Sequence, residues 1–131
     1  MNQHLLLAFL AVSAGGALGA VLRYGAMLTT ANWLKDPHHG TMLVNILGSL
    51  LVGYLLNLLP HDSGNNEFLR LAVITGVLGG FTTFSAFSMD TLLLLQNGEM
   101  GRAMLNIILT LSGTLIAVFI GYEAGRLIHA I

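Results

Sequence analysis

Hydroxyl and aromatic side chains alternate in one apolar stretch of this sequence, and this pattern is the one best suited to chemistry. The side chains of the stretch are Phe81, Thr82, Thr83, Phe84, Ser85 and Phe87. Hydroxyls donate hydrogen bonds, and the edge of a phenylalanine ring is electropositive. Both groups can contact an anion without placing a full positive charge beside it. Aromatic residues at this spacing more often serve packing, so packing is the alternative interpretation.

A pair of glycines, Gly79 and Gly80, directly precedes this stretch. In a helix, each costs about 1 kcal/mol relative to alanine, so the pair predicts a break in the helix. Unwound backbone at membrane depth is tolerated only inside protein or along a cavity, and its freed carbonyls can coordinate a cation. The stretch therefore predicts an ion pathway rather than an enzyme active site.

Other polar residues lie within apolar surroundings. Asn106, Thr110 and Thr114 follow a spacing of four residues, so they form one polar stripe along a helix face. This stripe favours a face lined by water or ions. Asn45 is a candidate for the ion pathway. The alternative interpretation is a role in helix packing, because amides in membrane helices often hydrogen-bond to neighbouring helices. Arg23 is either a structural or vestibule charge or a side chain that reaches out to the membrane interface.

The elements that must position these residues are four membrane spans. Of the 131 residues, 55% are hydrophobic and 8% are charged, whereas a soluble domain carries about 25% charged residues. Four stretches of 18 to 21 residues contain no Asp, Glu, Lys, Arg or His, and about 20 apolar residues cross a bilayer. The expected fold is an all-α membrane protein, 1–131 forming a single membrane-embedded domain. Its spans are expected at roughly 4–30, 40–60, 68–96 and 101–128, the third broken at Gly79-Gly80.

Composition excludes several classes of protein. The first apolar stretch is too long and lacks the basic start of a cleavable signal peptide. The chain has no cysteine, so it has no disulfide framework. Its net charge is −1 and it has no basic tail, so nucleic acid is not an expected partner.

The cationic side chains give almost no bias in orientation across the membrane. With four spans, Arg70 and Arg126 fall on one side, while Lys35, Arg102 and Arg23 fall on the other. Cytoplasmic loops normally carry the excess of Lys and Arg, so two against three permits insertion in both orientations. Two opposed copies could then pair. Four short helices leave little room for an internal pore, so we expect any conduit at a subunit interface.

Three motifs together resemble the Fluc (CrcB) fluoride channels. They are 15–20 (GGALGA) with Arg23-Tyr24, Gly40-Thr41 with Val44-Asn45, and 79–85 (GGFTTFS). Their order, the four spans and the length extend the resemblance over essentially the whole chain. The resemblance implies a dual-topology antiparallel homodimer with two fluoride pores and a structural sodium ion at its centre.

The resemblance also implies roles for particular residues. The sodium ligands would be the backbone carbonyls of Gly79 and Thr82. The fluoride pore would be lined by Phe84, Phe87, Asn45, Ser85, Thr110 and Thr114. Arg23 would be the vestibule or structural charge, and Phe81 would not be a pore residue.

Two positions depart from the family pattern. The family commonly has Ser-Thr-Phe where this chain has Ser85-Ala86-Phe87, so one hydroxyl is missing at Ala86. A Glu is usual shortly after that phenylalanine, and here the position holds the shorter Asp90. The first change is expected to alter conductance more than selectivity.

The expected function is passive export of fluoride from the cytoplasm through the inner (plasma) membrane. A pore selective for this small, strongly hydrated ion must replace its water with convergent donors. One alternative is a small dual-topology proton-coupled drug exporter, which needs a carboxylate deep in a span. The other is a structural assembly subunit without transport, for which glycine packing would suffice.

Overall fold

The computed structural model describes residues 2–34, 38–59 and 66–129, and these fold into four long apolar helical spans. Three are continuous helices: α1 (Gln3–Leu34), α2 (His38–Leu58) and α6 (Met100–His129). The third span, Glu67–Gln96, is interrupted. The four helical elements begin and end within a few residues of the predicted spans at each described end, and Pro60, the predicted end of the second, lies outside the described residues.

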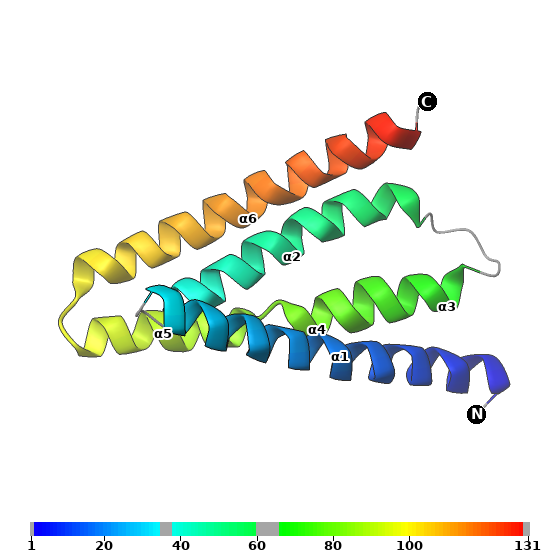
Figure 1. The fold of residues 1–131 in the computed structure, drawn as a ribbon, viewed down its shortest axis with the longest axis horizontal. Helices are drawn as coiled ribbons and strands as arrows, with labels where there is room; N and C mark the ends of the chain where they lie inside the picture. The colour runs from blue at the N-terminus through cyan, green and yellow to red at the C-terminus, as the bar shows by residue number, and fades with distance from the viewer. Residues whose placement is uncertain (1, 35–37, 60–65, 130–131) are drawn as a thin grey trace.

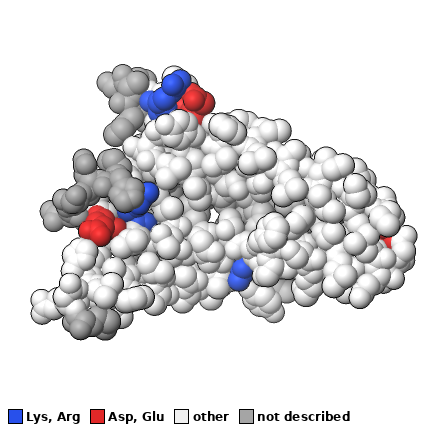
Figure 2. Space-filling view, turned by 180° about the vertical axis from the view of Figure 1, so that it is seen from behind, with Lys and Arg blue, Asp and Glu red and all other residues white. Residues whose placement is uncertain are grey.

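Two pairs of spans lie side by side. α1 packs along the third span, and α2 packs along α6 (Figure 1). The start of α1 and the end of α6 lie at the same end of the bundle, as an even number of crossings requires (Figure 1). Much of the outer surface consists of large apolar side chains such as Phe119, which is 69% exposed. Figure 2 shows most charged side chains of one face near one end, with an almost uncharged surface elsewhere. Lipid is the solvent that suits such a surface.

The third span contains four successive helical segments. They are α3 (Glu67–Arg70), the π-helix η1 (Leu71–Leu78), α4 (Gly79–Phe81) and α5 (Phe84–Gln96). The break lies between α4 and α5, at Thr82 and Thr83, whose backbones are extended with ψ of 157° and 119°. The prediction that the break falls at Gly79-Gly80 is therefore wrong by about two residues, since both glycines are helical.

Close packing explains why glycine is needed at Gly80 even though the helix continues through it. A Cβ atom built on Gly80 would lie 2.6 Å from the carbonyl oxygen of Gly16 in α1. The backbones of α1 and α4 thus touch, which is the usual use of small residues between membrane helices. Gly80 therefore allows α4 to pack closely against α1 without interrupting α4.

Glycine packing also sets the contact between α2 and α6, and this gives a first prediction. A Cβ on Gly121 would overlap the carbonyl oxygen of Leu50 and lie 2.9 Å from the nitrogen of Tyr54. Gly121→Val is expected to destabilise the protein by about 1–3 kcal/mol or more, because backbone cannot move aside as a side chain can. The loss of stability is measured by heating the protein in detergent and recording how much of it still elutes as a monodisperse peak in size-exclusion chromatography. Gly101→Val on the same helix is the control, because nothing lies within 4 Å of its added Cβ; equal losses in both variants would contradict the prediction.

Candidate functional site

The break in the third span is held open by local capping. Thr83 has φ of −156° and ψ of 119°, and it is the N-cap of α5. Its hydroxyl oxygen accepts a hydrogen bond from the backbone N–H of Ala86 at 3.1 Å. Threonine is a favoured N-cap because its oxygen satisfies a donor that the helix itself cannot. The same hydroxyl lies 3.1 Å from that of Ser85. The sequence therefore stops one helix and starts another within two residues.

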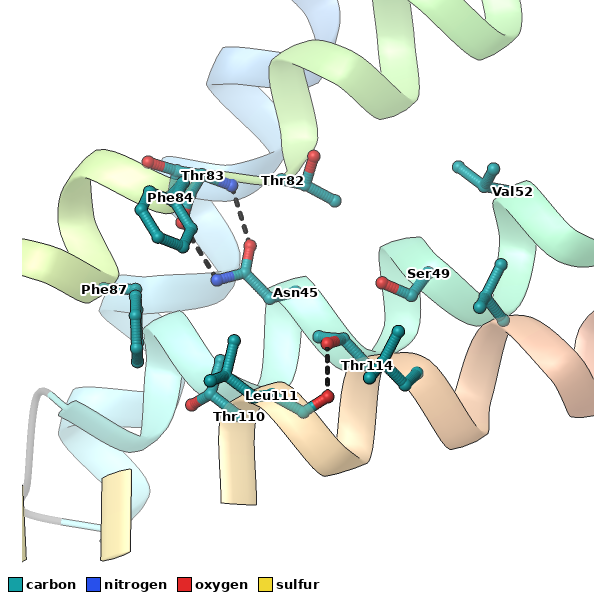
Figure 3. A pocket seen from close by; sticks show the side chains of 12 residues that line it. Asn45, Ser49, Val52, Thr82, Thr83, Phe84, Phe87, Thr110, Leu111 and Thr114 are labelled. Atoms are coloured by element: carbon teal, nitrogen blue, oxygen red, sulfur yellow. Dashed lines mark hydrogen bonds between the residues drawn. The ribbon is translucent and has the colours of Figure 1, made fainter. Parts of the chain in front are cut away.

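Asn45 of α2 secures the break from across the bundle. Its amide nitrogen donates to the carbonyl oxygen of Thr83 at 2.9 Å, and its amide oxygen accepts from the Thr83 N–H at 2.7 Å (Figure 3). Both residues are 8% exposed, so water does not replace these bonds. An unpaired backbone group in such surroundings costs several kcal/mol in lipid and about 1–3 kcal/mol in a protein interior. The amide thus supplies both partners that the extended residue has lost.

Two of these hydrogen bonds affect the backbone carbonyls predicted as cation ligands. In a continuous helix, the Thr83 N–H would reach the carbonyl of Gly79, and the Ala86 N–H would reach that of Thr82. Here Asn45 takes the first N–H and the Thr83 hydroxyl takes the second. The helix ladder therefore leaves the carbonyls of Gly79 and Thr82 without these donors. Hard cations favour oxygen ligands, so the chemistry of these two groups fits sodium.

Arg23 also reaches the break. Its guanidinium donates from Nη1 to the carbonyl oxygen of Thr82 at 3.3 Å. A carbonyl oxygen has two lone pairs, so this bond leaves one of them for another partner. Arg23 therefore contacts the protein in mid-span, and the alternative in which it only reaches out to the interface does not describe this geometry. Across residues 2–34, 38–59 and 66–129, no three His, Cys, Asp or Glu side chains gather into a metal site.

A groove of about 350 Å³ runs along α2, the break and α6. We call it the central groove. Its walls are Asn45, Ser49 and Val52 from α2, Thr82 to Phe84 and Phe87 from the third span, and Thr110, Leu111, Thr114, Leu115 and Val118 from α6 (Figure 3). Hydroxyl and amide groups therefore share one hollow with two phenylalanines and several aliphatic side chains. Such a surface offers hydrogen-bond donors to a small anion within otherwise apolar walls.

The two phenylalanines of the groove differ sharply in exposure. Phe87 is 7% exposed, whereas Phe84 is 71% exposed. Their ring centroids are 5.3 Å apart and their planes are inclined by 48°. This tilted arrangement directs ring edges and faces in different directions instead of stacking them. Phe81, which the resemblance did not assign to the pore, does not line the central groove.

The polar stripe of α6 is present, but each member has a different role. The hydroxyl of Thr110 is buried and donates to the amide oxygen of Asn106 at 3.4 Å. The amide nitrogen of Asn106 donates to the hydroxyl of Thr91 in α5 at 3.0 Å. Thr114 donates to the carbonyl oxygen of Leu111 in its own helix at 3.0 Å (Figure 3). Thr110 and Thr114 line the groove, while Asn106 lies beyond its end.

The structure brings together most, though not all, of the residues predicted for a fluoride pore. Asn45, Phe84, Phe87, Thr110 and Thr114 line the central groove. Ser85 does not line it within this chain, and its hydroxyl instead faces that of Thr83.

Two polar residues of the groove, Ser49 and Thr83, were predicted neither as pore residues nor as sodium ligands. Ser49 lies one helical turn after Asn45, so spacing in α2 could have found it. Nothing local to Thr83 distinguishes it from Thr82, because its role depends on an amide 38 residues earlier.

Fold and site together define a small four-span membrane protein with a broken third helix and a groove lined by hydroxyl, amide and phenyl groups. Residues 10–122 match the family model described as "CrcB-like protein, Camphor Resistance (CrcB)", and the chain belongs to this family. It is 44% identical over 126 residues to the fluoride-specific ion channel FluC of Elusimicrobium minutum, covering 95% of this chain and 98% of that one. It is 42% identical over 126 residues to the FluC of Rhizobium meliloti, covering 95% and 97%. The FluC of Thermus thermophilus is 44% identical over 118 residues, covering 89% and 94%.

Proposed function

We propose that this chain forms a fluoride-selective channel that exports fluoride from the cytoplasm by passive electrodiffusion. The observation that carries the proposal is the central groove, in which donors from α2, the break and α6 face two phenyl rings. The near full-length relatives at 42–44% identity, which are named as fluoride-specific ion channels, support the same conclusion. They favour it over a drug exporter, over a scaffold and over an enzyme.

The donors of the groove suit the removal of water from a small anion. Fluoride holds its water tightly, so a pore must offer hydrogen bonds as the water leaves. We assign this to Asn45, Ser85, Thr110 and Thr114, with ring edges from Phe84 and Phe87. The hydroxyls of Thr110 and Thr114 would turn from their present acceptors, Asn106 and the Leu111 carbonyl, to donate to the ion. One amide hydrogen of Asn45 is used by Thr83, and the second remains for an ion, since an amide nitrogen carries two. Chloride is larger, so a narrow groove with fixed donors disfavours it.

We infer that two antiparallel copies complete the conduit. Phe84, with 71% of its surface exposed in one chain, would then be covered by the second copy. The nearly equal numbers of cationic side chains on the two sides support opposed insertion. Twofold symmetry would place two equivalent grooves in one dimer, each a fluoride pore, within the inner membrane of the cell.

We infer further that a sodium ion is held where the two breaks meet. Two copies would offer four carbonyls, from Gly79 and Thr82 of each chain, which lack their usual helix donors. Sodium would supply a fixed positive charge at depth, and Arg23 would add a second cationic group beside it. The ion would be structural, because its ligands are backbone groups that hold two half-helices.

Efflux from proteoliposomes tests the proposal. With the protein reconstituted, a fluoride electrode is expected to record release that protein-free vesicles do not show, while a chloride electrode in matched vesicles records none. Replacing sodium by N-methylglucamine on both sides is expected to lower fluoride release. Equal release of chloride would contradict selectivity, and proton-coupled uptake of organic cations would favour the exporter. A monomeric mass in detergent would contradict the shared conduit.

A further inference from the structure

A second, smaller cavity lies next to the central groove along α2 and α6. This second cavity has a volume of about 140 Å³ and takes its polar walls from His38 and His39 of α2 and Arg102 and Asn106 of α6. Along both helices its residues directly precede those of the central groove. Thr110 of the central groove hydrogen-bonds to Asn106 of the second cavity, so the two hollows have neighbouring walls. An ion that follows the α2–α6 surface out of the central groove therefore passes His38.

A buried carboxylate, that of Asp90, contacts His38. Asp90 of α5 is 7% exposed, and its Oδ1 lies 3.4 Å from Nδ1 of His38. Within the described part of the chain, its second oxygen, Oδ2, is buried and makes no hydrogen bond. A carboxylate in such surroundings is costly unless a cation compensates it. Among the described residues, the His38 imidazole is in ion-pair contact with Asp90, so its protonation changes the net charge of the pair.

Other charged or titratable groups belong to the same cavity or to the elements packed against it. His39 is the next residue of α2, and Arg102 of α6 is ion-paired with Glu99. On α1, which touches α2 at Gly40, the sequence has no titratable side chain after Tyr24 as far as Leu34. Lys35 and Asp36 precede α2 and lie outside the described residues.

We propose that the His38–Asp90 pair is a proton-controlled charge that sets how readily anions pass the second cavity. The proposal rests on the proposed fluoride conduction. With His38 protonated, the pair is neutral overall, so an anion meets no net repulsion. With His38 neutral, the pair carries one negative charge within a low-dielectric wall, and it repels an anion strongly. Histidine is the side chain whose ordinary pKa allows such a change between pH 5 and 8.

Fluoride efflux measured against pH tests this proposal. The same pH is set inside and outside the vesicles, because orientation is not controlled, and protein-free vesicles at each pH supply the background of permeating hydrogen fluoride. From about pH 8.5 to about pH 6, the background-corrected rate is expected to rise at least about threefold. Asp90→Asn is expected to be fast throughout this range, because no anion-repelling carboxylate remains, and His38→Gln to be slow and flat.

Two histidine variants serve as controls. His4 forms the same kind of pair with Glu67 at 3.1 Å. Both of these side chains are largely exposed, and neither lines the second cavity. His4→Gln is expected to keep the full pH profile, and so is His39→Gln. A flat wild-type profile, or a profile abolished by His39→Gln and kept by His38→Gln, would overturn the proposal. If His38→Gln does not yield a monodisperse protein, the comparison of wild type with Asp90→Asn and His39→Gln decides the same question.

Loss of the channel function and loss of the role of the His38–Asp90 pair give different results in these recordings. Absence of fluoride release at every pH would contradict the proposed channel function itself. Release that is selective for fluoride but independent of pH would leave the channel intact and remove only the role of the His38–Asp90 pair. A purely structural pair would lower thermal stability when mutated and leave the shape of the pH profile unchanged.

Discussion

Replacement of Phe87 by isoleucine is expected to reduce fluoride efflux by about tenfold or more, with little change in stability. The ring lines the central groove and is 7% exposed. Isoleucine keeps an apolar side chain of similar bulk but removes the electropositive ring edge. A loss of about 1.4 kcal/mol at the highest barrier corresponds to tenfold in rate. Phe84→Ile is expected to act in the same direction, because its ring lines the same groove.

Electrode recordings from proteoliposomes measure both variants at equal protein density. Phe81→Ile is the matched control within the same segment, since Phe81 lies outside the groove. Phe119→Ile matches the exposure of Phe84 on a different helix. Efflux at the wild-type rate in the Phe84 and Phe87 variants, or equal losses in the controls, would refute the assigned roles. A loss confined to the groove residues separates an effect on the ion from general damage to the fold.

The second large effect is expected at Asn45. Asn45→Leu removes both hydrogen bonds to Thr83 and leaves a buried N–H and C=O without partners, at about 1–3 kcal/mol each. The Thr83 N–H would then be free to return to the carbonyl of Gly79, so the third span would tend to close into one helix. We expect a lower unfolding temperature, loss of fluoride efflux and loss of any sodium dependence.

Asn45→Asp sharpens this test. A carboxylate can still accept from the Thr83 N–H but cannot donate to its carbonyl, so an intermediate loss of stability is expected. Asn57→Ala is the matched control, because Asn57 donates one hydrogen bond to the carbonyl of Tyr122 in a more exposed setting. Unfolding temperatures in detergent rank the three variants. A leucine variant as stable as wild type would show that the break does not depend on this amide.

The four spans were predictable because lipid imposes a simple constraint on sequence. A long stretch without charged residues is enough to identify a crossing, whatever its neighbours are. The predicted groove residues were found mainly through a family resemblance, and most of them do share one hollow. Their shared location depends on the packing of α2 against α6, which no local pattern encodes.

The position of the break was not predictable from propensity alone. Gly79-Gly80 looked weakest as helix, yet Gly80 serves contact with Gly16 and stays helical. The chain opens instead at Thr83, where Asn45 offers compensating bonds from another helix. Similarly, the segment that contains His38 was interpreted as a connection, and its pairing with Asp90 joins residues 52 positions apart (90 minus 38). Non-local partners decided both outcomes.

The break has an electrical consequence. A helix carries roughly half a positive charge at its amino end and half a negative charge at its carboxyl end. By splitting one span, the chain places the amino end of the 13-residue α5 inside the membrane, beside the groove wall formed by Phe84 and Phe87. The carboxyl end of the preceding helical segment faces it across Thr82 and Thr83. An uninterrupted span would hold its two poles near the headgroups, whereas this one holds an opposed pair of poles at depth, where water does not screen them.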